Sequence, residues 1–331
     1  MSPHRDARRP GRHGRPHVAL VTDSTASLPP RVAEQWGVVV VPLDVVIGGE
    51  RRREGVDLAS ADLAAALESG ARVTTSQPAP AAFADVYARL AAAGAREIVS
   101  MHLSGDLSGT VRSAQVAALA APIPVHVVDS RSVVMGLGFA VLSAAQAVRG
   151  LQPGEVAAST SGDPVDGSRA RRLREMVGRR QRAEADVDAV EVAQRARQVG
   201  SQASAWFLVD SLEHLRRGGR LSATAAALGT VLGLRPILTL RDGRIDVAEK
   251  VRTRRAARDR LEAVAVAEVR RRGGARVAVH HLGQPDVAAE MAHQLEAWLG
   301  DLVGAVEVCE VSAVIGAHVG PGLLAVVVAD S

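Results

Sequence analysis

The chain has 331 residues, of which 47% are hydrophobic and 23% charged, as expected for a globular protein of about two domains. No apolar run reaches the roughly 18 residues that suggest a membrane span, and the basic N-terminus lacks the apolar core of a secretory signal. The single cysteine, Cys309, excludes an internal disulfide and suits a reducing, cytoplasmic setting.

The 40 basic residues include one lysine, Lys250, whose neighbours exclude a Walker loop and the ATP lysine motif of protein kinases. Residues 1–17 and 160–182 each carry a net charge of +4, so the rest of the chain is mildly acidic. Aromatic residues make up only 2%, too few for a platform that stacks single-stranded nucleic acid. We therefore expect no nucleic-acid partner.

The first half of the chain alternates strands with helices. Strand patterns cover His17–Thr22, Val38–Val41, Val45–Ile47, Glu97–Leu103 and Val125–Val128. Helical patterns cover 30–36, 61–67, 78–93, 108–120 and 132–148. Strands separated by helices predict a parallel sheet with helical crossovers, which we assign to an N-terminal domain of residues 17–152. The basic residues 1–16 are expected to be a disordered tail.

Residues 153–200 break this alternation, because they are rich in Gly, Ser, Asp and Arg, and we predict a partly disordered linker or insertion there. The C-terminal domain, residues 201–331, combines crossover units with a hairpin around the Asp242-Gly243 turn. Its predicted strands are 205–209, 237–240, 245–248, 276–280, 303–311 and 323–328. Its predicted helices are 212–217, 223–232, 254–271 and 286–299.

Polar residues cluster at the ends of these elements. The clusters cover 23–25, 74–78, 104–110 and 129–130. Strand ends of open α/β sheets usually bind ligands, and helix N-termini attract anions. His318 stands apart, since an apolar stretch precedes it and a Gly-Pro-Gly turn follows. Each cluster by itself is more typical of a simple helix cap, whereas several clusters on one edge make a small acidic ligand equally compatible with the sequence. His318 fits either a hydrogen-bonded core histidine or a donor that meets an anion.

Taken in order, the motifs of this chain resemble those of the DegV family from about residue 17 to 328. The matching segments are Asp23-Ser24-Thr25, Thr74-Thr75-Ser76-Gln77-Pro78, Leu107-Ser108-Gly109-Thr110, Asp129-Ser130, the run from Leu212 to Leu221, Pro236-Ile237-Leu238, Asp242-Gly243-Arg244-Ile245, Glu249-Lys250-Val251-Arg252-Thr253, and His318 before Gly320. The resemblance implies a two-domain α/β fold with an N-terminal parallel sheet and a mixed C-terminal α/β domain.

The resemblance also implies a function. The protein would bind one long-chain fatty acid, with the carboxylate between the domains and the tail in the C-terminal domain, and would need no cofactor and no metal. Thr75, with Thr74 beside it, Ser104 and His318 would hold the carboxylate. Arg252 would face the head group or a separate ATP-binding subunit of a fatty acid kinase, which makes the acyl-phosphate for phospholipid synthesis. Transient contact with a membrane would fit this role.

Two other classes of function compete with this one. In the first, His318 and Ser104 hydrolyse an acyl ester or acyl-phosphate, although the sequence has neither a G-x-S-x-G elbow nor an obvious orienting acid. In the second, the arginine-rich segments bind nucleic acid, which would give a steep salt dependence. We predict a binding protein and not an enzyme.

Overall fold

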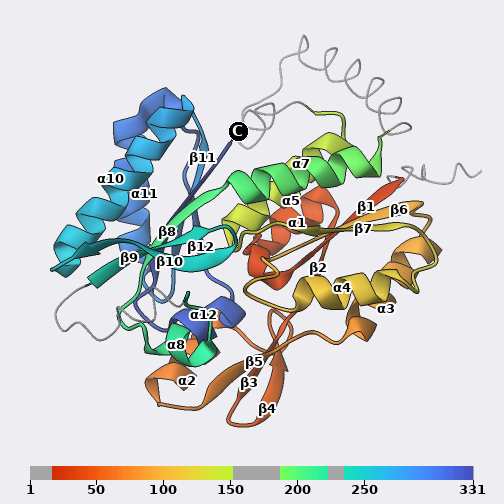
Figure 1. The fold of residues 1–331 in the computed structure, drawn as a ribbon, viewed down its shortest axis with the longest axis horizontal. Coiled ribbons are helices and arrows are strands. Elements are labelled where there is room, and N and C mark those ends of the chain that lie inside the picture. Colours follow the sequence, from red (N-terminus) through yellow and green to blue (C-terminus); the bar gives the residue numbers. More distant parts are fainter. Residues whose placement is uncertain (1–16, 152–186, 223–234, 331) are drawn as a thin grey trace, which may run out of the picture.

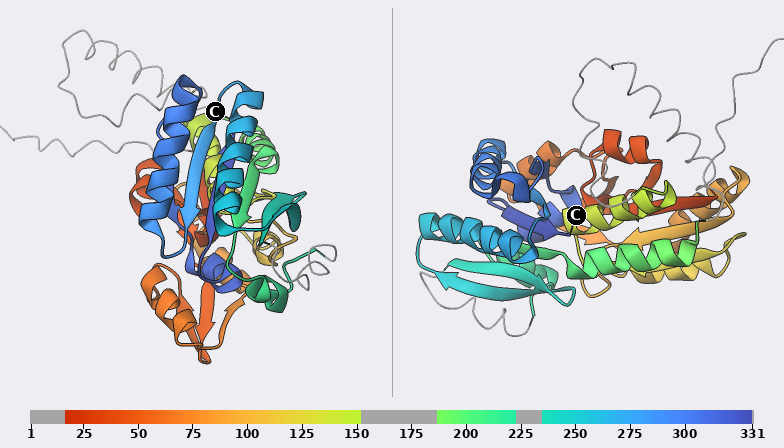
Figure 2. Two further views of the ribbon diagram at one scale, coloured as in Figure 1. Left: turned by 90° about the vertical axis from the view of Figure 1, so that its left-hand side faces the viewer. Right: turned by 90° about the horizontal axis from the view of Figure 1, so that it is seen from above.

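The computed structural model describes residues 17–151, 187–222 and 235–330, whose strands form three sheets (Figure 1). The predicted tail 1–16, most of the predicted linker and the predicted helix 223–232 lie outside the described residues. The two larger sheets belong to the two halves of the chain, and the smallest projects from one end of the molecule (Figure 2). This arrangement confirms the predicted α/β class with a parallel and a mixed sheet.

The first sheet has four parallel strands in the order β2-β1-β6-β7. These strands are β1 (Val18–Asp23), β2 (Val38–Val41), β6 (Glu97–His102) and β7 (Val125–Asp129). Their side chains alternate between two apolar layers, with Val99 in one and Ile98 in the other. A sheet that is apolar on both faces must be covered by helices on both faces.

Helices between its strands and after its last strand provide this cover (Figure 1). The helices α1 (Pro30–Trp36), α5 (Met135–Val148) and α7 (Ala189–Gln202) pack on one face, and α3 (Pro80–Ala92) and α4 (Thr110–Ala118) pack on the other. Pro30 and Pro80 each occupy the first turn of a helix, where the missing N–H costs nothing.

Helix α7 lies mostly within residues 153–200, which we predicted to be linker. Asp188 caps its N-terminus by accepting from Val190 N at 2.8 Å. Its apolar residues Val192, Ala193 and Ala196 recur at helical spacing and are buried against the first sheet. The arginine-rich composition that precedes this helix concealed the amphipathic pattern, so the linker prediction was wrong for residues 189–200.

The second sheet has six strands in the order β10-β9-β8-β13-β11-β12, and only β11 and β12 are parallel neighbours. Its strands are β8 (Ser204–Leu208), β9 (Arg235–Arg241), β10 (Arg244–Val251), β11 (Arg276–His281), β12 (Glu307–Glu310) and β13 (Leu324–Ala329). Helices α10 (Arg254–Arg272) and α11 (Pro285–Leu299) cover one face. A 3-10 turn at Gly300–Leu302 precedes the strand predicted at 303–311, which in the structure begins only at Glu307.

The third sheet is antiparallel, with the order β4-β3-β5. It consists of β3 (Asp44–Ile47), β4 (Glu50–Arg53) and β5 (Val73–Ser76). Sequence patterns missed β4 because its residues are all charged and exposed, and missed β5 because its hydroxyl side chains resembled a helix cap. The short helices α2 (Ser60–Glu68), α8 (Glu213–Gly218) and α12 (Ala313–Val319) also belong to this end of the molecule, and α12 was not predicted.

Helix α5 joins the two larger sheets. Leu137 and Val141 lie in the apolar core of the first sheet, while Met135 and Phe139 contribute to the core beneath the second. The helix is therefore apolar almost all round, as expected for a helix buried between two layers. No helix among the described residues combines the length and hydrophobicity that crossing a membrane would require.

Candidate functional site

A cavity of about 220 Å³ opens between the two halves of the chain. Its wall combines strands of the second and third sheets with the loops that follow β6 and β7 of the first sheet. Most of the wall is apolar, with Leu103 and Leu107 from the N-terminal half facing Phe207, Ile245 and Val327 from the C-terminal half. An apolar cavity that touches water is costly unless an apolar ligand fills it. The wall therefore suits a molecule with a long hydrocarbon part.

The polar end of the cavity is formed by Thr75 on β5 and His318 on α12. Thr75 Oγ1 and His318 Nε2 are 2.7 Å apart, within hydrogen-bond distance. Ser312 caps α12 by accepting from Ile315 N at 3.3 Å, which sets the direction in which the helix presents His318. Two residues 243 positions apart in sequence, each predicted to be part of the site, thus meet at one point.

His318 is uncharged at neutral pH. Burial and the nearby charge of Arg220 lower the pKa of the imidazole to about 4. The Nδ1 edge of the ring packs against Gly218, where an added Cβ would lie 2.6 Å from Nδ1. The close approach of α8 thus shields one nitrogen, and Nε2 is left to face Thr75 and the cavity.

Arg220 supplies the only formal charge among the described residues that line the cavity. Its Nε donates to the carbonyl of Leu107 at 3.1 Å, and Nη1 donates to the carbonyl of Gly218. The guanidinium therefore spans the two halves of the molecule. The Leu-Arg-Arg-Gly-Gly-Arg-Leu run pointed to this region, but the sequence did not distinguish Arg220 from its neighbouring arginines.

Ser76 is a second residue whose place in the site was not predicted. Its hydroxyl oxygen is buried, lines the cavity beside Thr75 and has no hydrogen-bond partner among the described residues. A buried hydroxyl without a partner is costly, so a polar ligand atom would relieve that cost. Gln77 also lines the cavity and is exposed, so the polar end reaches solvent.

Ser104 occupies a different position from the predicted one. It is completely buried, its Oγ donates to the carbonyl of Gly243 at 2.8 Å, and it accepts from Asp106 N at 3.3 Å. It does not line the cavity. Its hydroxyl joins the N-terminal half to the β9–β10 turn, and the expected direct contact with a ligand does not fit this geometry.

Thr74 and Arg252 also lie outside the cavity wall. Thr74 is exposed, because neighbouring side chains on β5 point to opposite faces and Thr75 takes the inner one. Arg252 is exposed and follows β10 at the open end of the β9–β10 hairpin, opposite the turn at Gly243 that contacts Ser104. Of the predicted carboxylate-binding residues, Thr75 and His318 line the cavity, and Arg220 and Ser76 line it with them.

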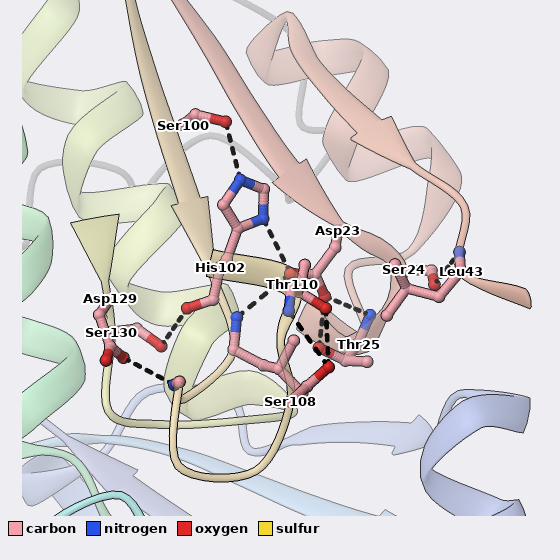
Figure 3. A network of polar contacts seen from close by, with 12 residues as sticks. Asp23, Ser24, Thr25, Leu43, Ser100, His102, Ser108, Thr110, Asp129 and Ser130 are labelled. Atoms are coloured by element: carbon pink, nitrogen blue, oxygen red, sulfur yellow. Dashed lines mark hydrogen bonds and ion pairs between the residues drawn. The ribbon is translucent and has the colours of Figure 1, made fainter. Parts of the chain in front are cut away.

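The polar clusters that follow β1, β6 and β7 do meet at one edge of the first sheet, as predicted (Figure 3). Leu103 N donates to Asp23 Oδ2 at 3.1 Å, and Gly105 N donates to Asp129 Oδ1 at 3.2 Å. The Asp23 and Asp129 side chains bond to the loops of neighbouring strands and do not line the cavity, whereas Ser108 of the cluster after β6 does. The direct role of the two carboxylates is to hold the loops that shape its wall.

The geometry does not support the hydrolase alternative. The partner of His318 is Thr75, and the Ser104 hydroxyl is directed at a backbone carbonyl. A nucleophile and its base need to be within hydrogen-bond reach of one another. Ser104 and His318 form no such pair here.

Known proteins resemble this chain over nearly its whole length. The sequence model for the family described as "Uncharacterised protein, DegV family" matches residues 17–160 and 179–331. A DegV domain-containing protein of Streptomyces coelicolor is 44% identical over 316 residues, covering 95% of this chain and 99% of that protein.

Solved structures agree with the sequence comparison. A DegV family protein from Thermus thermophilus, studied for its fatty acid binding, is 32% identical and superposes with a TM-score of 0.73 over 95% of this chain and 99% of its own. DegV from Bacillus subtilis, a fatty acid binding protein, is 28% identical with a TM-score of 0.79 over 96% and 100% of the two chains. The chain belongs to the DegV family.

Proposed function

We propose that this protein binds one long-chain fatty acid, with the carboxylate at Thr75 and His318 and the tail in the apolar cavity. The observation that carries the proposal is the cavity itself, whose described wall is mostly apolar and holds the bonded pair Thr75 and His318 at a polar end. The fatty-acid-binding relatives from Thermus thermophilus and Bacillus subtilis support the same ligand class.

The physical chemistry of the two ends favours such a ligand. Each buried methylene contributes about 0.8 kcal/mol, so the tail supplies most of the affinity and needs no specific contact. The carboxylate is costly to bury without donors. The Thr75 hydroxyl and a proton on His318 Nε2 both donate to it, and Arg220 supplies the opposite charge at the same end.

In the free protein the two donors, Thr75 and His318, are already positioned next to each other. Thr75 and His318 bond to each other at 2.7 Å, and a carboxylate entering between them exchanges that bond for two charge-assisted ones. Because the imidazole is neutral before binding, the incoming negative charge favours its protonation. Binding is therefore accompanied by proton uptake at pH values between the pKa of His318 in the free protein and its higher pKa in the complex.

The proposal extends to a partner. The bound acid would be presented to a separate ATP-binding subunit that phosphorylates it, as the family resemblance implies. Support comes from Gln77, which is exposed and lines the cavity beside Thr75, so a carboxylate held at Thr75 would lie close to solvent. Arg252, exposed on the C-terminal half, would belong to the docking surface. A cytoplasmic location with transient membrane contact fits a protein that receives its ligand from lipid.

Mass spectrometry of the purified protein tests the ligand assignment. We expect denaturing spectra to show about one fatty acid per chain, and delipidated protein to take up palmitate or oleate. Ala325 lines the cavity and is buried, so Ala325→Phe is expected to fill it and to lose the lipid while remaining folded. Folded parent protein that carries no lipid and refuses both acids would refute the proposal.

A further inference from the structure

Asp23, at the end of β1, is the centre of a buried polar network (Figure 3). Its Oδ1 accepts from the backbone N and the hydroxyl of Thr25, and its Oδ2 accepts from Leu103 N at 3.1 Å and His102 Nδ1 at 3.0 Å. Asp23, Thr25 and His102 are all completely buried. Four donors thus converge on one carboxylate away from water.

The hydrogen bonds that connect Tyr87 to Asp23 through Ser100 and His102 share one donor-to-acceptor direction. Since Asp23 only accepts, His102 carries a proton on Nδ1, and this leaves Nε2 to accept from the Ser100 hydroxyl at 2.8 Å. Ser100 in turn accepts from the Tyr87 hydroxyl at 2.9 Å. Although Asp23, His102 and Ser100 follow one another as in a hydrolytic triad, all three are 0% exposed, so no substrate reaches them.

Two chains of contacts connect Asp23 to the cavity. In the first, Asp23 caps the turn that begins at Ser24, and Ser24 Oγ accepts from the backbone N of Leu43 at 3.1 Å, a residue of the cavity wall. In the second, Asp23 holds Leu103, the first residue of the loop whose Leu107 carbonyl accepts from Arg220. The position of Arg220, the one charged side chain among the described residues of the wall, therefore depends on this loop.

We infer that Asp23, oriented by His102, is a positioning residue that sets the carboxylate-binding end of the cavity without touching the ligand. The inference rests on the proposed fatty acid function. If the contact between Asp23 and His102 is lost, the loop that begins at Leu103 shifts and Arg220 moves away from the head group. The tail-binding wall from the C-terminal half stays in place. The network thus governs recognition of the acid group more than recognition of the chain.

Two substitutions of His102 test separately the hydrogen bonds made by its two ring nitrogens. In His102→Asn the amide nitrogen stands near the position of Nδ1 and can still donate to Asp23, whereas the bond to Ser100 is lost. In His102→Gln the amide stands near the position of Nε2, so the bond to Ser100 is kept and the bond to Asp23 is lost. Both variants remove part of the ring from the same buried site, and each is the control for the other.

The measured quantity is the ratio of the affinities for palmitate and for hexadecanol, which share a tail and differ in charge. General destabilisation lowers both affinities alike and leaves the ratio unchanged. We expect His102→Gln to lower the ratio about tenfold, and His102→Asn and the distant Tyr87→Phe to stay within about threefold of the parent. Thr25→Val, which removes another donor to Asp23, is expected to lower the ratio even if His102→Gln does not fold.

The failures of the two hypotheses are distinct. A parent protein that binds neither ligand refutes the proposed function, and this inference with it. A parent that prefers palmitate, with equal ratios in His102→Asn and His102→Gln, refutes only the inference. If His102→Gln does not fold, a Thr25→Val protein whose palmitate-to-hexadecanol affinity ratio equals that of the parent refutes the inference instead.

Discussion

Replacing Thr75 with valine removes the hydroxyl that contacts His318 and nearly preserves the shape of the side chain. In the free protein this breaks one 2.7 Å hydrogen bond between partly buried groups, worth about 1 kcal/mol. The unfolding temperature should therefore fall by only about 2–4 °C. In the complex the same hydroxyl donates to a buried carboxylate, where such a bond is worth about 1.5–3 kcal/mol. Because the free protein loses about 1 kcal/mol of this, binding weakens by the difference, and the Kd for palmitate should rise about 2- to 30-fold.

Calorimetric titration of delipidated protein with palmitate measures the binding loss, and differential scanning calorimetry measures the stability loss. Thr74→Val is the matched control, because Thr74 is the neighbouring threonine on β5 and is exposed on the opposite face. It should leave both measurements unchanged. A Thr75→Val protein that binds palmitate like the parent, or a Thr74→Val protein that loses as much affinity, would refute the placement of the carboxylate.

Three further predictions concern other parts of the molecule. Burial raises the pKa of Glu54 to about 7, so the folded state keeps a proton that the unfolded chain releases near 4.5, and rising pH between these values favours unfolding. Glu54→Gln should therefore gain stability relative to the parent from pH 5 to 8, by on the order of 3 kcal/mol, and a pH-independent difference in denaturant midpoint would contradict this. Gly243 has a φ of +80°, and a Cβ added there would lie 2.4 Å from Ser104 Oγ. Gly243→Ala should therefore lower the melting temperature more than Gly37→Ala, because Gly37 has a φ of +67° but nothing within 4 Å of an added Cβ. Equal losses would show that the contact with Ser104 is unimportant. Arg252→Ala should bind fatty acid within a few-fold of the parent yet support much slower acyl-phosphate formation with an ATP-binding subunit, whereas unchanged rates of both would make Arg252 a solvated surface charge.

Sequence alone predicted the parts of the fold that depend on local patterns. The parallel sheet followed from apolar runs separated by helices, and the β9–β10 hairpin followed from its Asp242-Gly243 turn, where Gly243 adopts the positive φ that glycine allows. Thr75 and His318 were also predicted together, but only through the family resemblance. No local pattern indicates that residues 243 positions apart are in contact.

The tertiary structure decided which of several similar side chains belong to the site. Thr74 and Thr75 are identical in sequence terms, and only the pairing of β5 with β3 directs Thr75 inward. Ser104 was expected to donate to a ligand, yet its hydroxyl donates to the backbone carbonyl of Gly243 from the other half of the molecule. Arg220 enters the wall because its Nε reaches the Leu107 carbonyl across the interface. Periodicity and capping signals describe the nearest few residues of the chain, whereas each of these outcomes depends on a partner that folding brings from a distant segment.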